Sequence, residues 1–124
     1  KICEVGSVTP QSPLLITTNF SLTYYTVDGE VEASRVPAYI GVIDTEGTSV
    51  LTAFASDKLT SEKVAAFLNS DEIKKKVAHR KVIIPGYISA MSGSIKDDSG
   101  WTVLFGPREA SGISKYLKTV WPSA

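Results

Sequence analysis

The sequence is short of the residues from which metal and disulfide sites are built, with one cysteine and one histidine among 124 residues. A single cysteine excludes a framework of intrachain disulfides and favours a reducing compartment. One histidine and one cysteine also exclude a closed zinc or iron–sulfur site within this chain. His79 precedes an apolar run, where a solvated side chain is expected, so a Ser–His–Asp triad is not supported.

The sequence also lacks an excess of either charge, because thirteen Lys and Arg residues are balanced by thirteen Asp and Glu residues. A nucleic-acid binder normally presents a basic face, so this balance argues against nucleic acid as a partner. No apolar run approaches the roughly 20 residues of a membrane-spanning helix. No signal-peptide pattern is present either. The sequence predicts a cytoplasmic domain with no membrane partner.

The length suits one domain. The chain begins at Lys1 rather than methionine, and residues 1–12 hold Gly6, Pro10 and several small polar residues. Such composition is typical of a linker. We therefore expect residues 1–12 to be a linker remnant and residues 13–124 to form an α/β domain that is part of a larger protein.

Four short apolar runs are nearly continuous rather than alternating, which predicts strands buried on both faces of a parallel sheet. They are residues 14–16, 39–43, 82–84 and 103–105. Helical spacing appears between and after them. The order predicts an α/β fold, Rossmann-like or flavodoxin-like, doubly wound around a mainly parallel sheet.

The helices are predicted from spacing and start signals. A short helix is expected at residues 50–54, and another follows Thr60-Ser61-Glu62, continuing beyond a break at Asn69-Ser70. An apolar stripe from Ala110 to Trp121 predicts the last helix, with Pro107 as its first residue and Pro122 as its end. Residues 20–33 allow either a hairpin turning at Asp28-Gly29 or a crossover helix. We expect a helix over about residues 20–27, followed by a turn at Asp28-Gly29.

Small hydroxylic residues and glycine follow every predicted strand, in residues 17–19, 44–49, 85–89 and 106–109. Ligands of open α/β sheets bind outside the carboxyl ends of the strands, and glycine allows close backbone approach. The same residue types also cap helices and form turns, so the pattern by itself leaves both interpretations open.

The strand-end segments favour a neutral ligand. Neither a GxGxxG fingerprint nor a GxxxxGK[ST] loop is present. Asp44 and Glu46 can be interpreted as a metal or general-base pair, or as turn and cap residues, and they would repel a polyphosphate. A ligand that takes many neutral hydrogen bonds and an apolar wall remains. A corrin ring fringed with amides is such a ligand.

Three parts of the sequence, residues 16–24, 42–53, and 79–86 together with 106–110, resemble one family. It is the C-terminal domain of the large (gamma) subunit of the corrinoid iron–sulfur protein, the methyl carrier of the reductive acetyl-CoA pathway. The likeness runs from about Pro13 to Trp121. It implies a Rossmann-like fold that binds cobalamin at its strand ends, with Thr52 near the lower face of the cobalt. The implied cofactor contacts are Thr17, Thr23, Gly47, Thr48, Ser49, Val50, Thr52 and Ala110.

The resemblance also implies a function. Reduced cob(I) would accept a methyl group from a donor such as methyltetrahydrofolate and pass it to an acceptor such as acetyl-CoA synthase. The DxHxxG motif that supplies an axial histidine elsewhere is absent, which suits binding without a protein base at cobalt. The implied partners are a barrel-type small subunit, a methyltransferase, acetyl-CoA synthase and a reductive activator.

The family's four-cysteine motif for a 4Fe-4S cluster is absent, so that cluster is expected only in a preceding N-terminal part. By itself the domain is not expected to catalyse the full transfer cycle. The alternative from another class is a non-catalytic flavodoxin-like module that binds a nucleotide or docks a partner. A nucleotide module would depend on the helix start at Gly106-Pro107-Arg108, whereas a docking module would present an exposed apolar patch.

Overall fold

A computed structural model describes residues 2–107 and 110–120, without the side chains of residues 23, 110 and 120. Five strands form one sheet in the order β1-β3-β2-β4-β5. The elements are β1 (Ile2–Val5), β2 (Leu14–Thr18), α1 (Ser21–Ser34), β3 (Ala38–Ile43), α2 (Val50–Ala55), α3 (Ser61–Leu68), α4 (Asp71–Lys76), β4 (Lys81–Ile84), η1 (Gly86–Met91), α5 (Ser92–Ser99), β5 (Thr102–Phe105), η2 (Ala110–Gly112) and α6 (Ile113–Val120).

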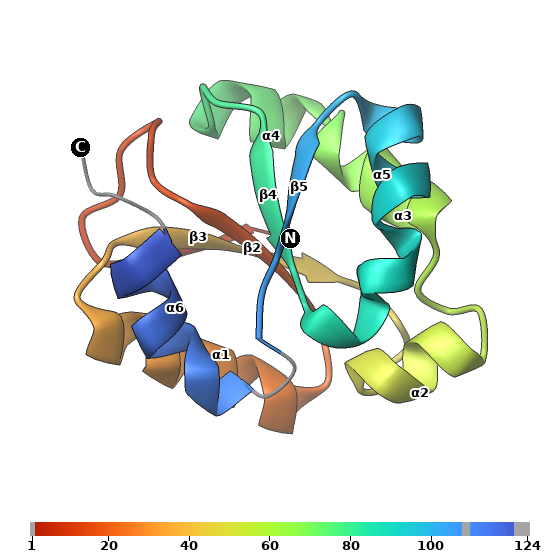
Figure 1. Cartoon of the computed structure of the whole chain (residues 1–124), viewed down its shortest axis with the longest axis horizontal. Helices are drawn as coiled ribbons and strands as arrows, with labels where there is room; N and C mark the ends of the chain where they lie inside the picture. Colours follow the sequence, from red (N-terminus) through yellow and green to blue (C-terminus); the bar gives the residue numbers. More distant parts are fainter. Residues whose placement is uncertain (1, 108–109, 121–124) are drawn as a thin grey trace.

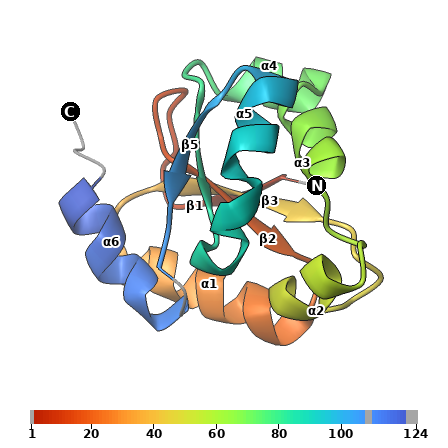
Figure 2. The same cartoon turned by 45° about the vertical axis from the view of Figure 1, so that its right-hand side comes forward.

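The sheet is parallel from β2 to β5, and β1 joins one edge antiparallel to β3. Helices α1 and α6 cover one face of the sheet, while α3, α4 and α5 cover the other (Figures 1 and 2). This is the expected doubly wound, mainly parallel α/β architecture. No helix within the described residues is both long and apolar enough to cross a membrane.

The sheet separates two apolar clusters, one under each helical layer. The first includes Leu68, Ile73 and Trp101 beneath α3, α4 and α5, and the second places Val31 and Leu117 of α1 and α6 against the other face. Both faces of the central strands are therefore buried. This burial explains why their sequences are continuously apolar rather than alternating.

The four apolar runs are confirmed as β2 to β5, and the helix start at Thr60 is confirmed by its hydroxyl, which accepts a hydrogen bond from the Lys63 amide. The turn predicted at Asp28-Gly29 is wrong, because α1 continues through both residues to Ser34. Glycine weakens a helix by about 1 kcal/mol, but burial of Val27 and Val31 on the same helix outweighs that cost.

The linker interpretation of residues 1–12 is wrong for residues 2–5, which form β1. Cys3 faces Ile40 across the antiparallel pair and packs against the second core cluster. An edge strand exposed on one side carries little apolar signal, so its pairing depends on β3. Whether the corrinoid-binding unit itself begins at Pro13 remains a prediction.

The last helix begins later than predicted. Pro107 is not its first residue, because the 3₁₀ turn Ala110–Gly112 precedes α6 at Ile113. Gly112 lies so close to Pro107 that an added Cβ would lie 3.0 Å from the proline Cβ. The predicted end of the helix, at Trp121 and Pro122, lies outside the described residues.

Candidate functional site

The candidate site lies between β2 and β4, whose following connections run to opposite sides of the sheet, to β3 and to β5. β2 is flanked by β3 on one side and β4 on the other, and the crevice at such a switch point is where open α/β sheets bind ligands. The pairing of β2 with β3 extends as far as Thr18, whereas its register with β4 is confined to Leu15 facing Ile83 in the described residues. β2 thus shares a much longer ladder with β3 than with β4.

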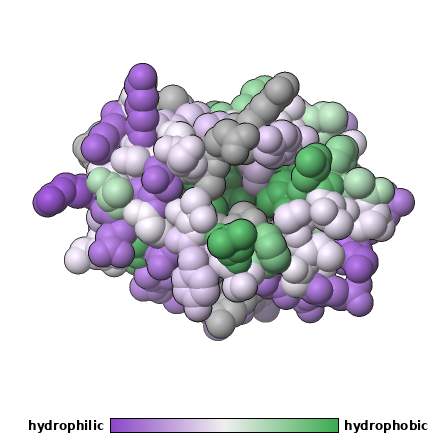
Figure 3. Space-filling model, turned by 90° about the horizontal axis from the view of Figure 1, so that it is seen from below, coloured by the Kyte–Doolittle hydropathy of each residue, from purple (hydrophilic) through white to green (hydrophobic). Residues whose placement is uncertain are grey.

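A cavity of about 260 Å³, here called the strand-end cavity, opens at this point. Its walls come from the ends of β2 and β4, the starts of α1, α2 and α6, and the segments after β4 and β5. The hollow is visible at the carboxyl edge of the sheet, with apolar side chains around it (Figure 3). None of the described residues that line it is acidic or basic. They are Leu15, Ile16, Thr17, Leu22, Thr26, Val27, Ser49, Val50, Leu51, Ile83, Ile84, Pro85, Tyr87, Gly106, Pro107 and Ile113.

Thr17 is the polar residue that the fold itself leaves unsatisfied. Its side chain is only 1% exposed, and its hydroxyl has no hydrogen-bond partner among the described residues. Leaving a buried hydroxyl unpaired costs roughly 1–3 kcal/mol. The neighbouring Thr18 is equally buried but donates its hydroxyl to the Thr48 carbonyl at 2.8 Å. Of these two buried threonines, the one that lines the cavity is thus the one whose hydroxyl has no partner among the described residues.

The loop between β3 and α2, residues 44–49, is held against the end of β2 by Asn19. The side-chain oxygen of Asn19 accepts from the amides of Thr45 at 3.1 Å and Gly47 at 2.9 Å, and its side-chain nitrogen donates to Asp44 Oδ1 at 2.9 Å. Its own amide donates to the Ile43 carbonyl. One side chain therefore sets the backbone of the first half of this loop.

Threonine hydroxyls set the second half of the loop. The Thr48 carbonyl accepts from Thr18 Oγ1 and from Thr45 Oγ1, and the Thr48 hydroxyl donates to the Thr45 carbonyl. Ser49 then caps α2 by accepting from the Thr52 amide at 3.3 Å. The loop thus delivers Ser49, Val50 and Leu51 to the cavity wall from a fixed backbone.

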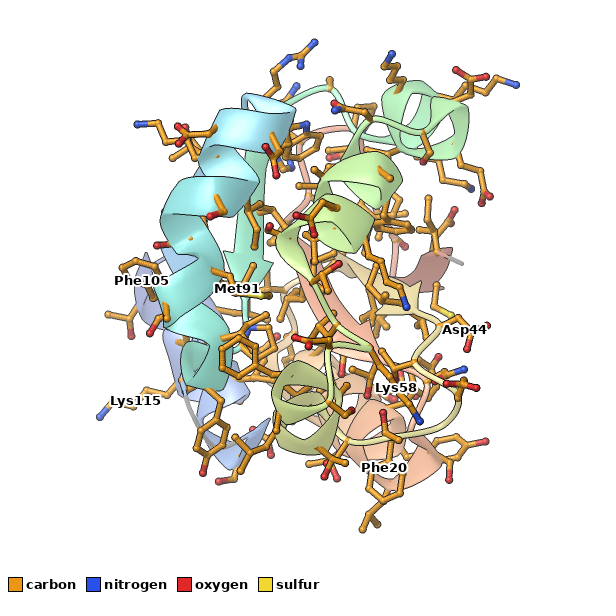
Figure 4. All side chains as sticks on the ribbon, turned by 90° about the vertical axis from the view of Figure 1, so that its right-hand side faces the viewer. Phe20, Asp44, Lys58, Met91, Phe105 and Lys115 are labelled. Carbon is orange, nitrogen blue, oxygen red and sulfur yellow. The ribbon has the colours of Figure 1, made fainter. Side chains whose placement is uncertain are left out.

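Asp44 and Glu46 act as turn residues, which supports the structural interpretation of this pair. Asp44 Oδ1 accepts from the Glu46 amide and from Asn19, and these two hydrogen bonds hold the pKa of Asp44 below its ordinary value. Glu46 pairs with Lys58 at 3.3 Å. Figure 4 shows Asp44 and Lys58 in the same region of the molecule, and neither of them lines the strand-end cavity.

His79 lies at the opposite edge of the sheet, as expected, but it is not simply solvated. Its Nδ1 accepts from the Lys81 amide, so Nε2 carries the proton and donates to the Ser12 carbonyl at 2.6 Å. Burial lowers the pKa of His79, against the opposing effect of the Ser12 hydrogen bond. Across the part of the chain that the structure describes, no three His, Cys, Asp or Glu side chains gather to hold a metal ion.

Three of the predicted cofactor residues, Thr17, Ser49 and Val50, lie together in the strand-end cavity. Gly47 and Thr48 belong to the loop that supports it. Thr52 is exposed one turn further along α2 and does not line the cavity. The side chains of Thr23 and Ala110 lie outside the description, so their roles remain predictions, as does that of the segment holding Arg108 and Glu109.

Sequence reasoning missed the apolar rim of the cavity. Leu22 is 69% exposed, Leu51 is 54% exposed and Tyr87 is 40% exposed, and all three line the cavity. Leu22 and Leu51 lie in the first turn of helices that follow strands. A large apolar side chain there, outside the helix's buried stripe, is the signal that would have identified them.

Comparison with known proteins finds relatives that match most of this sequence. The chain is 46% identical to the corrinoid/iron–sulfur protein large subunit of Moorella thermoacetica over 95% of its length, covering 26% of that relative. It is also 46% identical to the acetyl-CoA decarbonylase/synthase complex subunit gamma of Methanothermobacter thermautotrophicus, covering 94% of the chain and 25% of the relative. The corresponding subunit of Archaeoglobus fulgidus is 38% identical over 91% of the chain.

The chain spans about a quarter of the length of these relatives. A family model described as CO dehydrogenase/acetyl-CoA synthase delta subunit matches residues 1–117. The family description names a delta subunit, whereas the relatives are large or gamma subunits. On the extent of that match, the chain belongs to the CO dehydrogenase/acetyl-CoA synthase delta subunit family, CdhD.

Proposed function

We propose that this chain is a corrinoid-binding, methyl-carrying domain, and that cobalamin lies over the strand-end cavity. Thr17 is the observation that carries this proposal. A buried hydroxyl that has no partner, at the switch point of an open sheet, is explained if a ligand completes its hydrogen bonding. The similarity to a relative named as the large subunit of a corrinoid/iron–sulfur protein supports a corrinoid as this ligand.

The lining suits a corrin better than a phosphate ligand. Its polar side chains are Thr17, Thr26, Ser49 and Tyr87, which are neutral hydrogen-bonding groups, and the remaining side chains are apolar. The amides around a corrin ring can donate to and accept from such groups, and the ring itself presents an apolar surface. Without basic side chains, the described lining offers no counter-charge to a phosphate.

The size of the cavity indicates how the cofactor would lie. Pockets that enclose drug-sized ligands measure roughly 300–1,000 Å³, so a cavity of about 260 Å³ admits only part of a corrinoid. The ring would rest across the mouth on Leu22, Leu51 and Tyr87. Its other face would be covered by a second protein, for which the barrel-type small subunit is our proposed candidate.

The chain's residues would bind and orient the cofactor. Thr17 and Ser49 would hydrogen-bond its edge, and the apolar rim would exclude water from the ring. His79 lies at the far edge of the sheet, so the described residues offer no imidazole to the lower face. Reduced cobalamin would supply a cobalt nucleophile that accepts a methyl group for transfer to a partner such as acetyl-CoA synthase.

An absorbance titration of the purified protein with hydroxocobalamin tests the proposal. The expected result is saturable binding, followed by an electron paramagnetic resonance spectrum of the cob(II) form without coupling to a nitrogen of the protein. Coupling that changes when the protein is labelled with 15N would come from a protein base rather than from the cofactor's own benzimidazole, and would contradict our account of the lower face while retaining the corrinoid. No binding, with the barrel partner also present, would favour the nucleotide or docking function, and a parallel titration with ATP would distinguish these two.

A further inference from the structure

We propose that Asn19 is a positioning residue that holds the cobalamin-contacting loop, residues 44–49, in its binding conformation. This inference rests on the proposed function. Asn19 itself does not line the strand-end cavity. Its side chain instead bridges the end of β2 to three successive parts of the loop, through Asp44, Thr45 and Gly47.

The loop needs such a bridge because its backbone is not in a relaxed conformation. Glu46 has φ of 57° and Gly47 has φ of 79°, so two consecutive residues occupy the left-handed region. A non-glycine residue is uncommon there, and it persists where its surroundings fix it. The Asn19 oxygen satisfies the amides on both sides of Glu46, those of Thr45 and Gly47.

Both functions of the amide group are used. The oxygen accepts from two backbone amides and lies 3.3 Å from the Thr45 hydroxyl, while the nitrogen donates to Asp44 Oδ1. A carboxylate at position 19 would retain the acceptor but lose the donor. It would also place a second negative charge about 3 Å from Asp44, where two carboxylates do not both ionise readily. The amide is thus chemically specified at this position.

The first test is Asn19→Ala, with Asn69→Ala, at the only other asparagine, as the matched control. Losing the hydrogen bonds that hold the loop predicts that hydroxocobalamin affinity falls about tenfold or more, whereas Asn69→Ala leaves it unchanged. In the free protein, the Thr45 and Gly47 amides should exchange faster with solvent, which is a readout independent of cofactor. Unchanged affinity and unchanged exchange would overturn the inference.

The second test separates positioning from general stability by rescue. Asn19→Asp should bind hydroxocobalamin weakly at pH 7 and recover towards pH 5, because a proton shared with Asp44 restores the donor. The charged groups around this pair are Glu46, Lys58 and Lys63. The double variant Asn19→Asp with Asp44→Asn exchanges the two groups and should recover binding at pH 7. Wild type is titrated in parallel across this range.

The outcomes distinguish this inference from the proposed function. If wild type fails to bind hydroxocobalamin with the barrel partner present, both are overturned. If wild type binds and Asn19→Ala binds equally well, the inference alone is overturned. If Asn19→Ala unfolds, the folded Asn19→Asp protein decides, because a merely structural loss would show no recovery at low pH or in the double variant.

Discussion

The edge of the sheet at the amino ends of its parallel strands, here called the amino edge, differs from the edge at their carboxyl ends, the carboxyl edge, in how its polar groups are satisfied. At the amino edge, the polar groups satisfy one another: His79 bonds Ser12 and Lys81, and the Tyr39 hydroxyl donates to the Lys76 carbonyl. At the carboxyl edge, the Thr17 hydroxyl has no hydrogen-bond partner among the described residues, and Leu22, Leu51 and Tyr87 are exposed.

Under the proposed function, this difference would assign stability to the amino edge and cofactor binding to the carboxyl edge. Trp101 closes the amino edge, 3% exposed, with its amide donating to Ser99 Oγ. The carboxyl edge instead combines a rigid polar loop with an incomplete apolar surface. Folding leaves the Thr17 hydroxyl without a hydrogen bond among the described residues and leaves the apolar rim exposed. A bound ligand would supply these missing interactions.

The largest effect is expected at the amino edge. Trp101→Ala should lower the free energy of unfolding by about 3–5 kcal/mol, because it removes a large buried side chain from the core. Chemical denaturation measures this loss. Hydroxocobalamin affinity at temperatures where the variant is folded should stay unchanged, so a loss of affinity in the folded variant would contradict the division between the edges.

Thr17→Val should act in opposite directions on binding and stability. Removing the unpaired hydroxyl should raise the free energy of unfolding by about 1 kcal/mol, while hydroxocobalamin affinity falls about tenfold. Thr18→Val is the matched control, because Thr18 is as buried but hydrogen-bonded, and should lose about 1 kcal/mol of stability. A destabilised Thr17→Val would show that its hydroxyl is satisfied in the free protein.

Leu51→Asp tests the apolar rim. A charge on the ring-facing surface should weaken hydroxocobalamin binding several-fold, with stability within about 0.5 kcal/mol of wild type because Leu51 is exposed. Tyr25→Asp is the control, since Tyr25 is 68% exposed on α1 but does not line the cavity. Equal losses in both variants would indicate that net charge, rather than the rim, governs binding.

The smallest effect is the pH dependence from His79. Its folded-state pKa is lowered by burial, so the unfolded chain takes up the proton first as pH falls. Stability should therefore be full above about pH 6.5 and decline below it. His79→Gln should flatten this slope in thermal unfolding measured between pH 5 and 8. A variant with the wild-type slope would assign the dependence to other groups.

Much of the fold could be predicted because β2, β3 and β4 are buried on both faces and therefore have continuous apolar sequences, and the edge strand β5 carries a short apolar run as well. β1 could not, since its place depends on pairing with β3 rather than on its own composition. The continuation of α1 through Gly29 could not be predicted either, because the burial of Val27 and Val31 in the folded protein outweighs the local turn signal at Asp28-Gly29.

The candidate site, like the fold, could be predicted from the sequence only in part. The strand-end position of Thr17 and Ser49 follows from topology, although their selection as ligand contacts came from the family resemblance. Asn19 stood among the residues after the first strand, but its role required the three-dimensional approach of residues 44–47. The apolar rim was missed because the first-turn positions of Leu22 and Leu51 mark them in the sequence, but only the folded surface shows that both are exposed beside the cavity.

Hydrogen–deuterium exchange with and without hydroxocobalamin tests the central claim most directly, namely that the carboxyl edge binds the corrinoid. The account predicts that the cofactor slows exchange in residues 15–20 and 44–52 and leaves residues 74–81 at the amino edge unchanged. Protection of residues 74–81 without protection of residues 44–52 would place the ligand at the other edge and contradict the account.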